Sequence, residues 1–133
     1  MKRLVLSVFI VGLAVWFGFA STPSSKAEGP RREKAVVEFT QTVKLQGVLL
    51  RGEYVIVHDE ERMMRGEPCT WIYRSNKGEE GELIASFHCV HVEAAKAEKL
   101  IVRLKARKTP YDTPELLEFQ FAGSTAAHRV PGV

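Results

Sequence analysis

Hydrophobic residues recur at every second position in short runs along most of the chain, and turn-forming residues separate these runs. In the first run, Val37, Phe39 and Val43 share one face of an extended chain, while polar residues occupy the other face. The run at 54–58 is apolar on both faces, which is typical of a central strand. The runs that predict strands are 35–45, 48–50, 54–58, 69–74, 83–92, 100–107 and 116–121.

These runs do not alternate with helical segments, as they would in a βαβ fold. We therefore expect an all-β fold, a single small antiparallel β-sandwich or barrel of roughly six to seven short strands. The compact β domain is expected at 35–123, between a flexible leader at 21–34 and a loose tail at 124–133. Segment 93–99 is expected to be a loop before a strand, with one longer helix over 93–105 as the alternative.

The first 20 residues have the three-part layout of a secretory signal peptide. Met1-Lys2-Arg3 is positively charged, residues 4–20 are uncharged and almost wholly apolar, and small residues precede two candidate cleavage points, after Ala20 and after Ala27. The alternative is an uncleaved inner-membrane anchor, because an apolar run of about 17 residues is just long enough to span a bilayer. In both cases we expect the remainder to work outside the cytoplasm, as a secreted or periplasmic domain or as an outward-facing anchored one.

The net charge of +3 overstates how basic the exported part is. Removal of Lys2 and Arg3 with the signal leaves 17 of the 19 basic residues against 16 acidic ones, a net charge of +1. Cleavage after Ala27 would also remove Lys26 and bring the charge to zero. A nearly neutral domain has little of the field that attracts nucleic acid or anionic lipid, so neither is an expected partner.

Both cysteines, Cys69 and Cys89, lie in the part expected to be exported. An oxidising compartment and an even count favour one disulfide, Cys69–Cys89, over two separate buried thiols. A hairpin register that places Cys69 opposite Cys89 also places Trp71 opposite Phe87. That register would gather aromatic side chains on the same face as the bridge.

The sequence HCVH at 88–91 is the most reactive constellation in the chain. Cys89 and His91 share a face of a strand, and Cys69 would lie opposite, so these three could hold zinc or copper if the thiols stay reduced. His88 is added to this alternative set, although it points to the other face of the strand. His58 lies elsewhere in the sequence, beside a charged run at 59–61 that is expected to be solvated. With the disulfide preferred, we expect no metal and no cofactor.

Catalytic motifs are absent from the sequence, which contains neither Gly-x-Ser-x-Gly nor a CxxC pair. Ser124 and His128 fall in the tail that is expected to be loose, where a catalytic site could not be preorganised. We therefore do not expect an enzyme.

The chain resembles a type of small, signal-peptide-bearing exported bacterial protein in the segments FTQ (39–41), LLRGEY (49–54), GEPCT (66–70) and EFQFAG (118–123). The resemblance implies a signal peptide and a compact β domain with a cysteine pair, and it implies no activity or binding residues. The function we expect is that of an exported, non-catalytic binding or structural domain. Its partner would be an envelope or extracellular protein or a small ligand. The alternative is a periplasmic zinc- or copper-binding protein that uses the Cys/His cluster.

Overall fold

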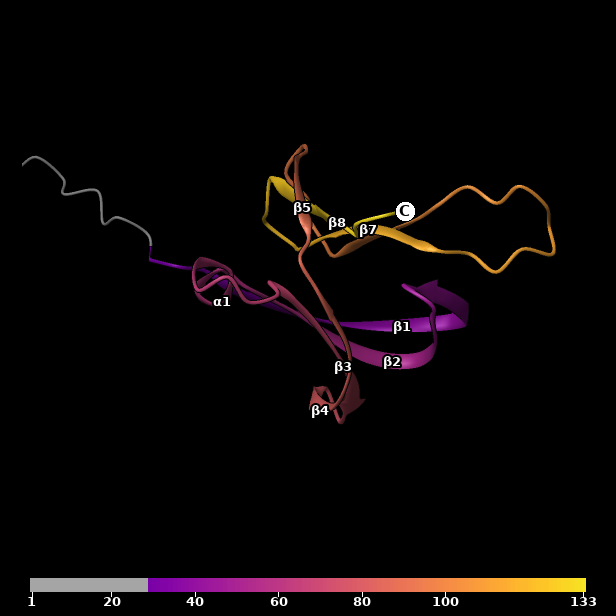
Figure 1. Ribbon diagram of the computed structural model, residues 1–133, viewed down its shortest axis with the longest axis horizontal. Coiled ribbons are helices and arrows are strands. Elements are labelled where there is room, and N and C mark those ends of the chain that lie inside the picture. The colour runs from indigo at the N-terminus through magenta and orange to yellow at the C-terminus, as the bar shows by residue number, and fades with distance from the viewer. Residues whose placement is uncertain (1–28) are drawn as a thin grey trace, which may run out of the picture.

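A computed structural model describes residues 29–133 and shows two layers of β structure (Figure 1). The expected all-β sandwich is confirmed, because the strands form two antiparallel sheets of four strands each. The first sheet has the order β1-β2-β3-β4 and the second the order β5-β8-β7-β6. The predicted signal peptide, its anchor alternative and the leader up to residue 28 lie outside the described residues. Within residues 29–133, no helix is long and apolar enough to cross a bilayer.

The first sheet contains β1 (Arg32–Leu45), β2 (Val48–Asp59), β3 (Thr70–Asn76) and β4 (Glu79–Phe87), with the short helix α1 (Glu60–Met64) between β2 and β3. The second sheet contains β5 (Val90–Glu93), β6 (Ile101–Leu104), β7 (Leu116–Gln120) and β8 (Ala126–Arg129). Residues 29–133 form eight strands, against the expected six or seven. The runs at 48–50 and 54–58 join into the single strand β2, the run at 83–92 divides where the chain passes from one sheet to the other, and the tail supplies a strand of its own.

The hydrophobic core lies between the two sheets and takes side chains from both. Phe39 and Ile56 come from the first sheet and Phe119 from the second, and all three are buried. The stretch 54–58 is buried without interruption, as expected for a central strand, and β2 indeed lies between β1 and β3. Burial of each large apolar side chain stabilises the fold by about 1.5–3 kcal/mol relative to exposure.

The β3–β4 hairpin has a different register from the predicted one. Its turn is the two-residue loop Lys77-Gly78, in which both residues have positive φ (53° and 83°), as a type I′ hairpin turn requires. Two register shifts then occur along the hairpin, so that its far end pairs Thr70 with Phe87 and Trp71 with Ser86. Each shift moves the pairing by one residue, which sequence alternation alone does not reveal.

The predicted pairing of Trp71 with Phe87 is therefore wrong, and so is the shared aromatic face. A shift of one residue moves side chains to the opposite face of the sheet. Ile72 occupies the buried face with Phe87, whereas Trp71 and Tyr73 are only half-buried.

The segment after residue 123, predicted to be loose, is an ordered part of the sandwich. Strand β8 pairs with both β5 and β7, and His128 and Val130 in this segment are buried. The helix alternative over 93–105 is also wrong, because a loop precedes β6 there. Ala97 in that loop bonds to Ser124 through its backbone and is buried, which explains its lack of helical structure.

Gly81→Ala should destabilise the protein by about 1–3 kcal/mol, because overpacking forces backbone shifts. A Cβ at position 81 would lie 2.5 Å from the carbonyl oxygen of Arg74 across the hairpin. Urea unfolding of this variant should be compared with that of Gly29→Ala, where a Cβ meets nothing within 4 Å. Equal stabilities of the two variants would show that β4 does not approach β3 as closely as described.

Candidate metal centre

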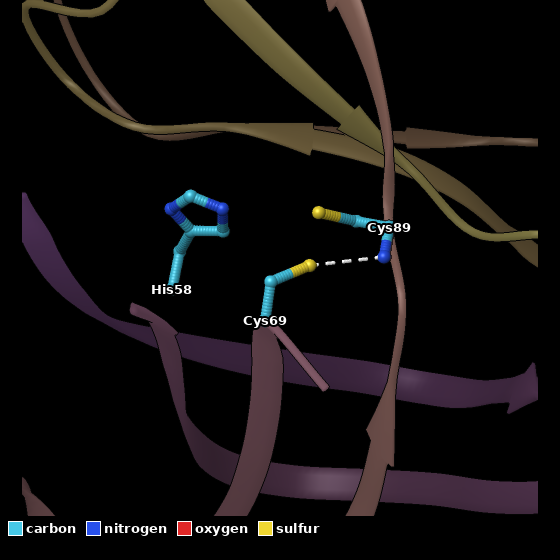
Figure 2. A group of neighbouring side chains, drawn as sticks. All are labelled: His58, Cys69 and Cys89. Atoms are coloured by element: carbon cyan, nitrogen blue, oxygen red, sulfur yellow. Dashed lines mark hydrogen bonds between the residues drawn. The ribbon is translucent and has the colours of Figure 1, made fainter. Parts of the chain in front are cut away.

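Five chemically reactive side chains from both sheets converge at one end of the sandwich. Glu33 lies near the start of β1, His58 near the end of β2, and His128 in β8. Cys69 immediately precedes β3, and Cys89 lies between β4 and β5, where the chain crosses between the sheets. Strand pairing brings Glu33 and His58 directly opposite each other. Figure 2 shows His58 and the two cysteines pointing into the same space between the layers.

The two cysteines and His58 form the sulfur side of this cluster. One ring nitrogen of His58 and the sulfurs of Cys69 and Cys89 all lie within 4.8 Å of one another. The backbone N–H of Cys89 donates a hydrogen bond to Cys69 Sγ at 3.0 Å, and Cys89 Sγ lies 3.6 Å from His128 Nδ1. His128 therefore adds a nitrogen beside Cys89, while its other nitrogen belongs to a second donor group with Glu33 and His58.

The two imidazoles lie against each other in the interior. The ring centroids of His58 and His128 are 4.0 Å apart with an angle of 34° between the planes. Phe119 stacks on His128 with its centroid 5.3 Å away. The two histidines are only 3% and 2% exposed, so solvent does not satisfy their nitrogens.

Glu33 faces the opposite edges of the same two rings. Its Oε2 lies 3.8 Å from Nδ1 of His58 and 3.8 Å from Nε2 of His128. Neither of these nitrogens has a hydrogen-bond partner among the described residues. Unpaired buried nitrogens are costly, which indicates that the site is built for a further interaction.

The protonation states suit metal ligation. A side-chain hydrogen bond with Cys89, and secondarily one with His58, lower the pKa of the Cys69 thiol, so that its thiolate is favoured. The pKa of Cys89 is raised, first by that same bond with Cys69 and then by burial, so the pair retains one proton. Burial, followed by repulsion from His58, lowers the pKa of His128 to about 4. A thiolate and a neutral imidazole are the forms that bind metal ions.

The predicted disulfide is not formed in this structure, in which Cys69 and Cys89 are free thiols. The two residues are not opposite each other in the hairpin, because Cys69 precedes β3 and Cys89 follows β4. Cys69 Sγ accepts the backbone N–H of Cys89, while the Cys89 side chain contacts His128.

The structure brings together only part of the metal set proposed from the sequence. Cys69 and Cys89 belong to it, but His91 and His88 are exposed and lie outside the donor groups found among the described residues. His91 meets the ring of His128 edge-on, with centroids 6.1 Å apart. His58 and His128 take their places, and only the long-range pairing of the sheets reveals this.

A cavity of about 430 Å³ opens beside the cluster and connects it to the surface. Its lining includes Glu33 and His128 together with Glu60 and Glu93. Three carboxylates against the one arginine of the lining, Arg31, give the opening a net negative charge that favours cations. A larger cavity of about 670 Å³ lies elsewhere and contains none of the cluster's donors.

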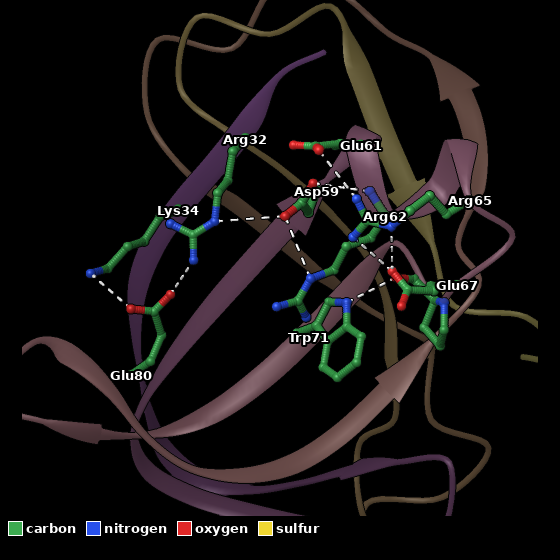
Figure 3. A network of polar contacts seen from close by, with 10 residues as sticks. Arg32, Lys34, Asp59, Glu61, Arg62, Arg65, Glu67, Trp71 and Glu80 are labelled. Carbon is green, nitrogen blue, oxygen red and sulfur yellow. Dashed lines mark hydrogen bonds and ion pairs between the residues drawn. The ribbon is translucent and has the colours of Figure 1, made fainter.

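The strand that carries Glu33 is held in place by a polar network beside it (Figure 3). Arg32 forms ion pairs with Asp59 and Glu80, which fasten the start of β1 to the end of β2 and to β4. Asp59 also caps α1 by accepting the N–H of Arg62 at 3.2 Å, and the Arg62 guanidinium lies 4.2 Å from the centre of the Trp71 ring. Lys34, on the other side of Glu33, pairs with Glu79 and Glu80, so ion pairs hold the backbone on both sides of Glu33.

Comparison with protein-family models, with curated proteins and with solved structures finds no match to this chain. The chemistry of the cluster itself is therefore what indicates a function.

Acid should destabilise the metal-free protein between about pH 6.5 and pH 4. The folded-state pKa of His128, about 4, lies below the ordinary value of 6.5, so the unfolded state binds more protons in this interval. The stabilisation is complete above pH 6.5 and is lost as the pH falls through 4, with a total of about 3 kcal/mol. Urea unfolding at a series of pH values, in the presence of a chelator, measures this loss of stability.

The matched variant is His128→Asn, which removes the titrating ring. The groups that face this ring are Glu33, His58, Cys69, Cys89 and His91. They remain in the variant, so the difference between the two pH profiles isolates His128. Identical profiles would contradict the assignment.

Proposed function

We propose that this protein binds a transition-metal ion, with Zn²⁺ as the first candidate, through Cys69, Cys89, His58 and His128. Two thiolates and two imidazoles are a common tetrahedral donor set for zinc. Soft thiolates also suit Cu⁺, which is the main competitor. Metal binding is the alternative that the sequence suggested, and we prefer it to an unspecified partner because a buried donor set supports it.

The observation that carries the proposal is the 3.6 Å separation between Cys89 Sγ and His128 Nδ1 inside a buried cluster. In a tetrahedral site, a Zn–S bond of about 2.3 Å and a Zn–N bond of about 2.0–2.1 Å place the two donor atoms about 3.5 Å apart. The remaining donors, from His58 and Cys69, lie within 4.8 Å of Cys89 Sγ. His128 contacts this group through Cys89, so binding one ion by all four residues requires the His128 ring and the other three donors to move together.

The charge of the Cys69 side chain also supports metal binding. The Cys69 side chain favours the thiolate in a position that is only 1% exposed. A buried anion is costly unless a cation or several hydrogen bonds compensate for it. A bound cation would supply this compensation and would also release the remaining proton from Cys89.

Four protein donors would leave no open coordination position, which is typical of metal storage, transport or structural stabilisation rather than catalysis. We therefore retain the expectation of a non-catalytic protein. We also retain the proposed location outside the cytoplasm, in the periplasm or secreted, on the strength of the predicted signal peptide. There, bound metal would protect the two thiols from oxidation.

Zinc titration of the reduced, metal-free protein tests the proposal. We expect one Zn²⁺ per chain, and a loss of affinity of about 100-fold or more in Cys69→Ser and in His58→Asn. Each variant removes one donor of the set. His88→Asn is the matched control, because this exposed histidine lies next to Cys89 but outside the cluster.

Binding of Co²⁺ gives a second readout, since a thiolate-to-cobalt charge-transfer band reports sulfur ligation directly. The band should be present in wild type and in His88→Asn and should be weaker in Cys69→Ser. Circular dichroism confirms that each variant is folded. Absence of zinc binding by the wild-type protein, or equal affinity in Cys69→Ser, would overturn the proposal.

A further inference from the structure

We propose that Glu33 is a positioning residue that orients both histidine ligands by accepting a hydrogen bond from each of them on the side away from the metal. This inference rests on the proposed function, because it concerns the same site. Histidines that bind metal ions almost always donate their other ring N–H to a carboxylate, a carbonyl group or water. Here one carboxylate would serve two ligands.

The distances support a shared acceptor. A single oxygen of Glu33, Oε2, is equally far from Nδ1 of His58 and Nε2 of His128, at 3.8 Å. Both nitrogens are buried and have no hydrogen-bond partner among residues 29–133. The Glu33 side chain is 23% exposed beside the cavity, so it has room to move the distance of somewhat under 1 Å that a hydrogen bond requires.

The backbone places Glu33 there in a defined way. Glu33 in β1 is paired with His58 in β2, and its neighbour Arg32 is fixed by ion pairs to Asp59 and Glu80. The carboxylate therefore projects from a restrained strand and not from a free terminus. Such support makes it suitable for orienting a ligand.

The carboxylate would also select the tautomer of each ring. A neutral imidazole carries one N–H and one lone pair, and the N–H must face the acceptor. His58 would then be protonated on Nδ1, and Figure 2 shows its other ring nitrogen directed toward the two sulfurs. His128 would be protonated on Nε2, leaving the lone pair of Nδ1 beside Cys89 Sγ.

The metal could also bind on the other side of the two histidine rings, and an experiment can distinguish the two positions. Glu33, His58 and His128 also offer donor atoms within 4.8 Å of one another, so a metal could bind on the carboxylate side instead. In that case the tautomers would be reversed, with the proton of His58 on Nε2 and that of His128 on Nδ1. The tautomeric state therefore identifies the side on which the metal lies.

The test combines zinc affinity with ¹H–¹⁵N correlation spectra of the histidine rings in the zinc-loaded protein. Glu33→Ala should weaken zinc binding about 10- to 100-fold. Glu33→Gln should weaken zinc binding less, because the amide oxygen can still accept hydrogen bonds although it lacks the negative charge. Glu93→Gln is the matched control: it removes the same charge from the lining of the same cavity, and its affinity should change less than about threefold.

The ring spectra provide a readout that simple destabilisation would not alter. Wild type should show Nδ1–H on His58 and Nε2–H on His128, and Glu33→Ala should lose the protection of both protons from exchange with water. If the wild-type protein binds zinc but the two Glu33 variants match it in affinity and ring spectra, Glu33 does not position the ligands, and the metal site itself stands. Reversed tautomers would also overturn this inference, since Glu33 would then be a ligand. Failure of wild type to bind zinc would remove the proposed function and this inference with it.

Discussion

The contact between His58 and His128 is the feature on which the rest of the site depends. These two rings come from different sheets and lie 4.0 Å apart, and both side chains are almost fully buried. Burial of two polar rings costs free energy unless their nitrogens find partners. The cysteine thiols on one side and the carboxylate of Glu33 on the other provide groups that can meet this requirement. A cation bound between the sulfurs and the rings would supply the partner that is still missing.

The fold creates this environment at the point where the chain passes from the first sheet to the second. Cys89 lies in that crossing, and Cys69 lies where α1 and its following turn lead into β3. These positions are irregular backbone, which frees the Cys89 N–H to bond to Cys69 Sγ rather than to a neighbouring strand. Aromatic residues of the core, such as Phe119, cover the rings from the interior. The polar cluster is thus an extension of the hydrophobic core.

Much of the architecture could be predicted from the sequence, because a half-buried strand repeats its pattern every two residues. This period identified the fold class, the central position of β2 and the strand character of β6. It could not reveal the two register shifts in the β3–β4 hairpin, and these put Trp71 on the opposite face of the sheet from the buried Phe87. The short final strand was missed because Ala126–Arg129 carries little apolar periodicity of its own and is buried by pairing with β5 and β7.

The candidate site, like the fold, could be predicted only in part from the sequence. Cys69 and Cys89 could be selected from the sequence because their chemistry is distinctive. His58 and His128 are 70 positions apart, and only the packing of two sheets brings their rings together. Local spacing instead favoured His91 and His88, which the structure leaves exposed. A strand neighbour in sequence points to the opposite face, so proximity along the chain was a poor guide here.

X-ray absorption at the zinc edge of the zinc-loaded protein decides whether the Cys/His cluster holds the ion, because it identifies the atoms bound to the metal. Binding by the cluster should give two sulfur neighbours at about 2.3 Å and two nitrogen neighbours at about 2.0–2.1 Å. A coordination shell of nitrogen and oxygen alone, without sulfur, would contradict it.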